Sequence, residues 1–229
     1  MGTMVAFTWE LLLSIIAPPR CAACGCPADL MAVFCPPCAA MTVRLPMGGR
    51  SELAAFAYGG SIAWAIARFK YEQRPDLGRP LGDLLTRAIS PLRDELAGAL
   101  VIPVPLHPHR LAERGYNQSC LLAARVARGL GARMRARALS RTRPTASQAT
   151  LDRAARGHNV ENAFFARNPQ SLRGERVLLI DDVRTTGKTL DACTRALVEA
   201  GVSGVAWAVL AQADGEPSSR ASDARGRAE

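Results

Sequence analysis

A short segment near the C-terminus combines residue types that bind phosphate and sugar hydroxyls. Asp181 and Asp182 directly follow the apolar run 177–180. The residues after them are small, hydroxylated or cationic: Thr185, Thr186, Gly187, Lys188 and Thr189. Backbone N–H groups and hydroxyls at a helix N-terminus can surround a phosphate dianion, and a glycine lets the anion approach closely. The two carboxylates can accept hydrogen bonds from vicinal ribose hydroxyls, so the pattern predicts a sugar-phosphate site at the end of a buried strand.

The same residues partly match the phosphate loop of an ATPase. Gly187-Lys188-Thr189 is the end of the pattern G-x-x-x-x-G-K-[ST]. The first glycine of that pattern would be residue 182, which is aspartate. A carboxylate there would repel the phosphates that the loop must surround, so we reject an ATPase loop. The remaining alternative is a strand, an acidic turn and a helix that bind nothing.

Two Cys-x-x-Cys pairs lie close together near the N-terminus. They are Cys21 with Cys24 and Cys35 with Cys38. This spacing lets two tight turns present four thiolates to one ion, and four thiolates leave no open coordination position. The pattern therefore predicts a structural metal site that stabilises a segment too small to fold around its own core. We expect zinc, with iron as an alternative; Cys26 can exchange roles with Cys24, and a set of free thiols is the other interpretation.

Apolar runs alternate with helical patterns over most of the chain. The predicted strands are the runs 53–58, 100–104, 177–180 and 201–210. Helices are predicted after Gly59-Gly60, at about 77–89 and over 118–130. Strands that alternate with helices favour a parallel sheet whose strands are covered on both faces.

The charge of the chain favours anionic partners. The 29 Lys and Arg residues exceed the 20 Asp and Glu residues, which leaves a net charge of +9. Phosphorylated metabolites and nucleic acid are partners of this kind, although a GC-rich genome that encodes arginine frequently would give the same excess. Between Arg125 and Arg156 nine arginines face one acid, Asp152. We expect an anion-facing surface there, either a lid over pyrophosphate or a track for a nucleic-acid backbone.

Two further basic segments are candidates for binding a pyrophosphate. Three prolines, from Pro103 to Pro108, stiffen the chain where it leaves the run 100–104, and Arg110 and Arg114 follow before a turn at Gly115. Arg143 lies in the arginine-rich segment. The alternative interpretation of both segments is a solvated basic loop.

The N-terminal region carries no export signal that we recognise. The apolar run 11–17 is well below the roughly 20 residues that span a bilayer, and no Lys or Arg precedes it. We expect a short amphipathic helix, no membrane insertion and a cytoplasmic location, where thiols remain reduced.

The segment Asp181 to Thr189 resembles the signature of type I phosphoribosyltransferases, which bind phosphoribosyl pyrophosphate (PRPP). The resemblance implies that Asp181 and Asp182 are the catalytic acid pair that holds the ribose. It also implies that the loop from Thr185 to Thr189 holds the 5-phosphate. Phosphoribosyltransferases without further modules lack the cysteine pairs. The chain resembles the ComF family, in which five segments occur together in a fixed order. In this chain they are the cysteine pairs, Phe69-Lys70-Tyr71, the proline-rich junction 102–118, the segment 141–148 and the Asp181 segment.

The resemblance implies a fold, a division into domains and two classes of function. We expect an α/β fold, a type I phosphoribosyltransferase-like parallel sheet flanked by helices (51–212), with a zinc-ribbon-like module before it (1–50) and a disordered tail after it (213–229). An enzyme would bind PRPP with Mg²⁺ and transfer the phosphoribosyl group, while Arg110, Arg114 or Arg143 neutralises pyrophosphate. The alternative is a non-catalytic protein that binds single-stranded DNA beside a competence helicase during DNA uptake. Arginines that converge on Asp181 favour the enzyme, and a stripe leading away from it favours DNA.

Overall fold

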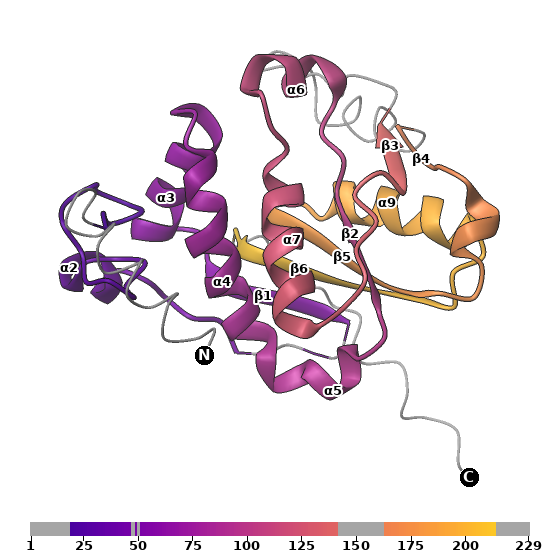
Figure 1. The fold of residues 1–229 in the computed structure, drawn as a ribbon, viewed down its shortest axis with the longest axis horizontal. Helices are drawn as coiled ribbons and strands as arrows, with labels where there is room; N and C mark the ends of the chain where they lie inside the picture. The colour runs from indigo at the N-terminus through magenta and orange to yellow at the C-terminus, as the bar shows by residue number, and fades with distance from the viewer. Residues whose placement is uncertain (1–18, 47–48, 50, 142–162, 214–229) are drawn as a thin grey trace, which may run out of the picture.

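A four-stranded parallel sheet forms the centre of the protein (Figure 1). The computed structural model describes residues 19–46, 49, 51–141 and 163–213. The strand order is β1 (Glu52–Ala57), β6 (Gly204–Gln212), β5 (Arg176–Arg184) and β2 (Leu100–Pro103). All three strand pairs are parallel, which confirms the predicted sheet.

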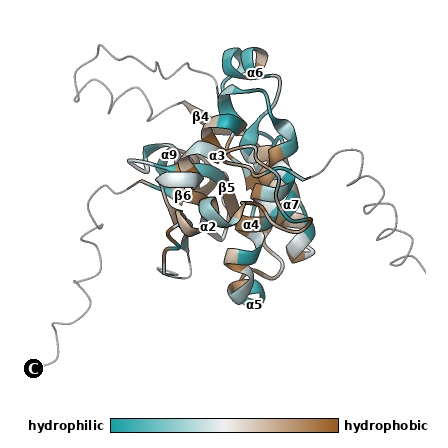
Figure 2. Cartoon of the chain, turned by 90° about the vertical axis from the view of Figure 1, so that its left-hand side faces the viewer, coloured by the Kyte–Doolittle hydropathy of each residue, from teal (hydrophilic) through white to brown (hydrophobic). Residues whose placement is uncertain are grey.

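Helices cover both faces of the sheet. Helices α3 (Gly60–Tyr71), α4 (Gly78–Ile89) and α7 (Gln118–Leu130) share one core with Leu178 and Ile180 of β5. Helix α9 (Lys188–Glu199) shares the other core with Val177 and Leu179. Alternate residues of a strand point to opposite faces, so the apolar run of β5 is buried on both sides, as its sequence predicts. Figure 2 shows the hydrophobic residues gathered between these layers.

Short elements complete the described chain. Helices α2 (Pro36–Ala40), α5 (Arg93–Leu96) and α6 (Pro108–Arg114) have one or two turns, and 3-10 turns lie at Pro75–Leu77, Ser90–Leu92 and Pro169–Leu172. A separate antiparallel pair consists of β3 (Leu139–Arg141) and β4 (Phe164–Ala166). The predicted helix 118–130 has those bounds. The predicted helix at 11–17 lies outside the described residues, as does the tail after residue 213.

The cysteine segment packs against the sheet and its helices. Cys21, Phe34 and Cys38 belong to the core shared by α3, α4 and α7. Residues 43–45 pair antiparallel with β1, where Leu45 N–H donates to Ala55 O at 3.1 Å. The division of the chain at residue 50 stays a prediction. None of the helices in the described ranges combines the length and apolar character needed to cross a bilayer.

Glycines allow α4 and α7 to pack closely. Gly78 and Gly82 lie one turn apart on α4, so they share one face of the helix. A Cβ atom on Gly78 would lie 2.7 Å from Cβ of Leu121, and one on Gly82 would lie 2.6 Å from Cβ of Arg125. Both distances are shorter than real Cβ contacts, so a larger residue would push the two helices apart.

The Gly82→Val variant tests this packing. We expect the free energy of unfolding to fall by about 1–3 kcal/mol, the usual effect of overpacking a core. Urea denaturation followed by circular dichroism measures it. Gly204→Val is the matched control, because nothing lies within 4 Å of a Cβ at Gly204. Equal stability of the two variants would contradict the close helix contact.

Candidate functional site

The acid pair lies where β5 extends past its neighbour β2. The last pair between these strands is Pro103 with Ile180, whereas pairing with β6 continues to Arg184. The sequence predicted a buried strand that ends in the two acids, and the pairing with β6 extends it two residues further, to Arg184. Asp181 and Asp182 therefore lie at the carboxyl end of the sheet, beside an edge that β2 no longer covers.

Asp182 forms an ion pair with a lysine from α3. Lys70 Nζ lies 2.9 Å from Asp182 Oδ1, and the side chains are 23% and 8% exposed. Burial alone would lower the pKa of Lys70, but the charge and hydrogen bond of Asp182 and the charge of Asp181 outweigh burial and raise it. Lys70 therefore carries its charge at neutral pH and compensates the buried carboxylate.

Asp181 has different partners. Ser119 Oγ donates to Asp181 Oδ1 at 2.7 Å, and the N–H of Asp182 donates to the same oxygen at 2.9 Å. Burial and the neighbouring charge of Asp182 raise the pKa of Asp181 to about 7, against the opposing effects of Ser119 and Lys70. The Asp181 carboxyl is thus a group that changes its charge near physiological pH.

The predicted phosphate loop connects β5 to α9. Gly187 has a φ of 77° and precedes the first residue of α9, which explains the glycine by its left-handed conformation. The free N–H groups of the first helical turn point toward the loop. Thr185 and Thr189 line the adjacent cavity; Thr186 and Lys188 are exposed and are not among its lining residues.

The opposite wall is the junction between β2 and α7. Val104 N–H donates to Ile180 O at 2.9 Å, and Asn117 Nδ2 donates to Val104 O at 3.0 Å. Asn117 also caps α7, and Gly115 has the left-handed φ of 81° that its predicted turn requires. The short helix α6 within this junction was not predicted, because two prolines precede it and a third is its first residue.

One cavity of about 670 Å³ joins both walls. Its lining includes the acid pair and the cations Lys70, Arg110, Arg114 and Arg141. Two donors on this lining, Gln118 Nε2 and Arg141 Nε, are buried and have no hydrogen-bond partner among the described residues. A buried donor without an acceptor carries a desolvation cost, so both atoms are suited to a ligand with acceptor oxygens.

The structure brings together only some of the predicted residues. Asp181, Asp182, Thr185, Thr189, Arg110 and Arg114 share the cavity, and Arg143 lies outside the described residues. Sequence reasoning missed Lys70, Gln118, Ser119 and Arg141 as site residues. The sequence analysis used Phe69-Lys70-Tyr71 as one of the segments that resemble the ComF family, but it predicted no role for Lys70.

Several arginines of the basic segment serve the fold. Arg125 forms an ion pair with Asp83 at 2.7 Å, and Arg133 forms one with Glu175 at 2.8 Å. Arg135 donates to the carbonyl of Ser171 at 3.0 Å. Of the described arginines between residues 125 and 141, Arg141 is the one that lines the cavity.

The four predicted metal ligands converge. The Sγ atoms of Cys21, Cys24, Cys35 and Cys38 all lie within 4.8 Å of one another, and those of Cys24 and Cys35 are 3.6 Å apart. Tetrahedral thiolates at about 2.3 Å from zinc lie about 3.8 Å apart, so the cluster fits a metal ion of that size. Burial would raise the pKa of the Cys21 thiol, but backbone hydrogen bonds from Cys24, Cys35 and Ala23 lower it to about 6, whereas burial raises the pKa of the Cys38 thiol to about 12.

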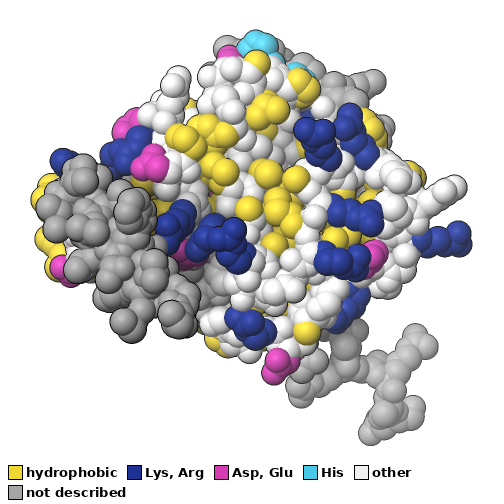
Figure 3. Space-filling view, in the orientation of Figure 1, with side chains coloured by type: hydrophobic (Ala, Val, Ile, Leu, Met, Phe, Trp, Pro, Cys, Tyr) yellow, Lys and Arg dark blue, Asp and Glu magenta, His cyan; other side chains and the backbone are white. Residues whose placement is uncertain are grey.

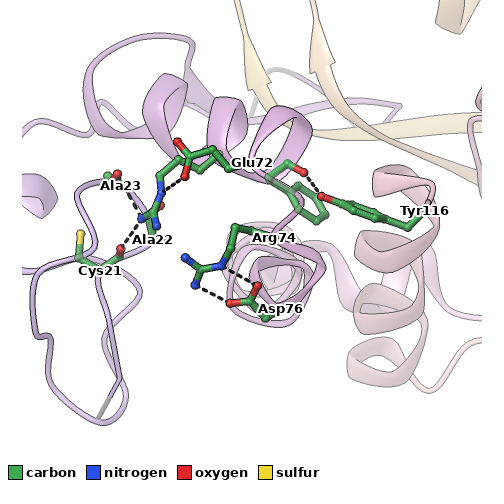
Figure 4. A network of polar contacts seen from close by, with 9 residues as sticks. Cys21, Ala22, Ala23, Glu72, Arg74, Asp76 and Tyr116 are labelled. Carbon is green, nitrogen blue, oxygen red and sulfur yellow. Dashed lines mark hydrogen bonds and ion pairs between the residues drawn. The ribbon is translucent and has the colours of Figure 1, made fainter. Parts of the chain in front are cut away.

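Helix α3 holds the first cysteine turn through Arg68 (Figure 4). Arg68 Nη1 donates to the carbonyls of Cys21 and Ala22 at 3.2 Å and of Ala23 at 3.4 Å. Its Nε donates to Glu72 Oε2 at 3.0 Å, which orients the guanidinium.

Metal content of two serine variants tests the ligand set. We expect Cys24→Ser to lose bound zinc, because an alcohol is a poor replacement for a thiolate ligand. Cys26→Ser should keep about one equivalent per chain, since Cys26 is not in the cluster of four. Elemental analysis of the purified proteins measures both. Zinc loss from Cys26→Ser with retention in Cys24→Ser would exchange the two assignments.

Comparison with known proteins gives the family. A model of the phosphoribosyl transferase domain matches residues 117–226. Competence protein F of Haemophilus influenzae is 31% identical over 199 residues, 85% of each chain. DNA utilization protein YhgH of Escherichia coli O6:H1 is 30% identical over 188 residues, 81% of this chain and 80% of that protein. A glutamine PRPP amidotransferase from B. subtilis covers 62% of this chain and 30% of its own, with 21% identity and a TM-score of 0.42. By its sequence and its domain model, the chain belongs to the ComF family of the phosphoribosyltransferase superfamily.

Proposed function

We propose that the chain binds PRPP or a related ribose 5-phosphate with Mg²⁺ and transfers the phosphoribosyl group with release of pyrophosphate. The observation that carries the proposal is the shared cavity, whose lining combines the hydroxyl residues Thr185 and Thr189, the carboxylates Asp181 and Asp182, and the arginines Arg110, Arg114 and Arg141. Its volume of about 670 Å³ is typical of sites for small metabolites. The resemblance of the Asp181 segment to PRPP-binding proteins supports the same ligand.

Each part of the ligand has a counterpart in the cavity. Thr185 in the loop and Thr189 in the first turn of α9 suit the 5-phosphate. Asp181 and Asp182 suit the ribose hydroxyls, which donate hydrogen bonds. Arginines supply donors for pyrophosphate oxygens: Arg110, Arg114 and Arg141. The unpartnered Gln118 Nε2 and Arg141 Nε support the proposal, because pyrophosphate offers acceptors to both.

The residues present fit a magnesium ion that arrives with the ligand. Mg²⁺ is commonly held by one or two carboxylates together with phosphate oxygens and water. Asp181 and Asp182 supply carboxylates, and the described residues offer no group of three or more acidic or histidine ligands that would bind the ion alone. Bound there, Mg²⁺ would supply positive charge to the pyrophosphate.

The chain's own residues would act by position and charge. The lone pair of an incoming nucleophile forms a bond to C1′ of the ribose while the bond from C1′ to the pyrophosphate oxygen breaks. The electron pair leaves with pyrophosphate, and the nucleophile loses a proton. The carboxylates orient the ribose, and the arginines stabilise the charge that develops on the leaving group. We place this site in residues 51–212 and a structural zinc ion, held by four thiolates, in residues 1–50.

Binding of single-stranded DNA is the second candidate. Relatives named for competence and DNA utilization support it. Trp64 and Tyr71 on α3 are 50% and 71% exposed, and exposed rings can stack on bases. Arg110, Arg114 and Arg141 nevertheless converge on the acid pair. Figure 3 shows Lys and Arg groups at the left and along the right-hand side of one face. Because three arginines line the cavity of the acid pair, we rank the small ligand first.

Calorimetric titration with PRPP and Mg²⁺ tests the proposed function. We expect saturable binding with a Kd below about 1 mM. The Asp181→Asn/Asp182→Asn variant should bind at least about a hundredfold more weakly, because each hydrogen bond to a charged group contributes roughly 1.5–3 kcal/mol. Asp191→Asn is the matched control, since Asp191 is exposed on α9 outside the cavity lining. If wild-type protein binds single-stranded DNA but no PRPP, the second candidate replaces the first.

The affinity for PRPP should also depend on pH through Asp181. Its pKa of about 7 means that the carboxylate, the form that accepts hydroxyl hydrogen bonds, becomes dominant only above neutral pH. We therefore expect binding to strengthen from about pH 6 to pH 8 more than it does in Asp181→Asn, where the phosphates of PRPP alone titrate. The effect of Asp181 on folding has the opposite sign. The folded state keeps a proton that the unfolded chain releases near pH 4, so the Asp181 contribution to stability falls between about pH 4 and pH 7. If the affinity for PRPP depends on pH identically in wild type and in Asp181→Asn, the assignment to Asp181 is refuted.

A further inference from the structure

The nucleophile that attacks C1′ of the ribose also needs a place in the cavity. Polar groups of the lining suit the phosphate, the ribose hydroxyls and the pyrophosphate, whereas the two tyrosines of the lining serve none of these. They are Tyr58 and Tyr71, which are 44% and 71% exposed. A large ring that lines a cavity and stays open to solvent offers a face on which a planar group of a ligand can stack.

The order of the strands separates two sides of the site. Strand β5, which carries the acids, lies between β2 at one edge of the sheet and β6 followed by β1 at the other. Arg110 and Arg114 belong to the junction that follows β2, whereas Tyr58 directly follows β1. Tyr71 lies on the arginine side, because the Arg114 guanidinium is 5.5 Å from the centre of its ring. Of the two tyrosines, Tyr58 is thus the one at the opposite edge of the sheet.

The chemistry at C1′ gives this separation a meaning. A direct displacement at the anomeric carbon of a sugar places the nucleophile and the leaving group on opposite faces of the ring. With pyrophosphate held by the arginines, as proposed above, the nucleophile enters from the side of β1. A heterocycle that attacks through a ring nitrogen meets C1′ with its edge, because the reactive lone pair lies in the plane of the ring. Its faces then turn toward the walls of the cavity, and Tyr58 provides an aromatic wall on that side.

The backbone around Tyr58 is held from two sides. The N–H of Tyr58 donates to Gln212 O at the end of β6, at 2.7 Å. Two residues later the chain packs against the cysteine segment: Gly60 has a φ of 46°, and a Cβ atom on it would lie 2.6 Å from the carbonyl oxygen of Met41. A ring on such a segment needs little further ordering when a ligand binds, which favours affinity.

We propose that Tyr58 is a specificity-determining residue of the acceptor subsite, where it stacks on a planar aromatic nitrogen heterocycle and so selects this class of nucleophile over aliphatic amines. A ring nitrogen forms the bond to C1′ while the bond from C1′ to the pyrophosphate oxygen breaks. The electron pair of that bond leaves with pyrophosphate, and the proton of the ring N–H passes to water. The product is a nucleoside 5′-monophosphate or an analogue of one. This inference rests on the proposed function.

Calorimetry with two ligands isolates the contribution of the ring. Ribose 5-phosphate and adenosine 5′-monophosphate share the phosphate and the ribose, but only the nucleotide carries an aromatic ring at C1′. We expect the nucleotide to bind wild type about tenfold more tightly, which is an ordinary gain from stacking one base on an aromatic side chain. Uridine 5′-monophosphate, which has a smaller ring, should show a smaller advantage of the same sign. If neither nucleotide binds more tightly than ribose 5-phosphate, the acceptor subsite is refuted.

Three variants assign this advantage to one residue. Tyr58→Leu should reduce it to less than about twofold and keep the affinity for ribose 5-phosphate, whereas Tyr58→Phe should keep both, because it retains the ring. Trp64→Leu is the matched control, since Trp64 is a half-exposed ring on α3 outside the cavity lining. An advantage that survives in Tyr58→Leu, or one that Trp64→Leu removes equally, overturns the proposal. If Tyr58→Leu does not fold, Tyr58→Gln undergoes the same titrations.

Titration with PRPP and Mg²⁺ separates this inference from the proposed function. Tyr58→Leu should bind PRPP as wild type does, because PRPP carries no acceptor ring. If wild type binds PRPP but prefers neither nucleotide to ribose 5-phosphate, the acceptor subsite fails alone. If wild type binds none of these ligands, the proposed function fails and the subsite fails with it.

Discussion

Two neighbouring carboxylates lie where β5 extends beyond β2, and the cost of placing both charges there shapes the structure around them. Each of the two acids has a polar partner of its own. Lys70 from α3 meets Asp182, and Ser119 from α7 meets Asp181. These partners come from the helices of one layer, so the packing of that layer and the electrostatics of the site are not independent. Burial remains only partly compensated at Asp181, whose pKa stays near 7.

Helix α3 links this acid pair to the cysteine cluster. Its last turn contacts the first cysteine turn through Arg68 and the acids through Lys70, two residues later. Residues two apart on a helix point in different directions, so one turn can reach two partners on different sides. The cysteine segment has few apolar residues of its own and shares its core with α3. A metal ion at the four thiolates would therefore stabilise the same helix turn that carries Lys70. In this way the cysteine segment would support the acid pair through α3.

Local patterns were sufficient to predict much of the fold and the centre of the site. The Asp181 segment, the cysteine pairs and helix 118–130 carry their signals within a few residues, and buried apolar runs indicate a parallel sheet. The missed residues depend on contacts across the chain: Lys70, Ser119 and Arg141 reach the acids from elements separated from β5 in the sequence. The length of β5 was underestimated because β6 pairing, which no local pattern contains, carries the strand past the acids. The sequence analysis attributed the glycine at position 187 to the close approach of an anion. The left-handed φ of this residue is by itself a sufficient reason for a glycine there.

The distribution of arginine shows why charge counts alone describe this protein poorly. The excess between residues 125 and 156 predicted one anion-facing surface, and this stays a prediction for Arg143, Arg153 and Arg156, which lie outside the described residues. Within the described part, Arg125 and Arg133 are paired with acids from α4 and from the turn before β5. Each of these pairs links two segments of the fold and places an acid beside its arginine. The cations that remain at the cavity are Lys70, Arg110, Arg114 and Arg141, from two helices and one strand. The cations attract phosphate groups, whereas the two carboxylates a few ångströms away repel them. This arrangement favours a ligand that presents hydroxyls and phosphates at separate positions over a uniformly charged strand.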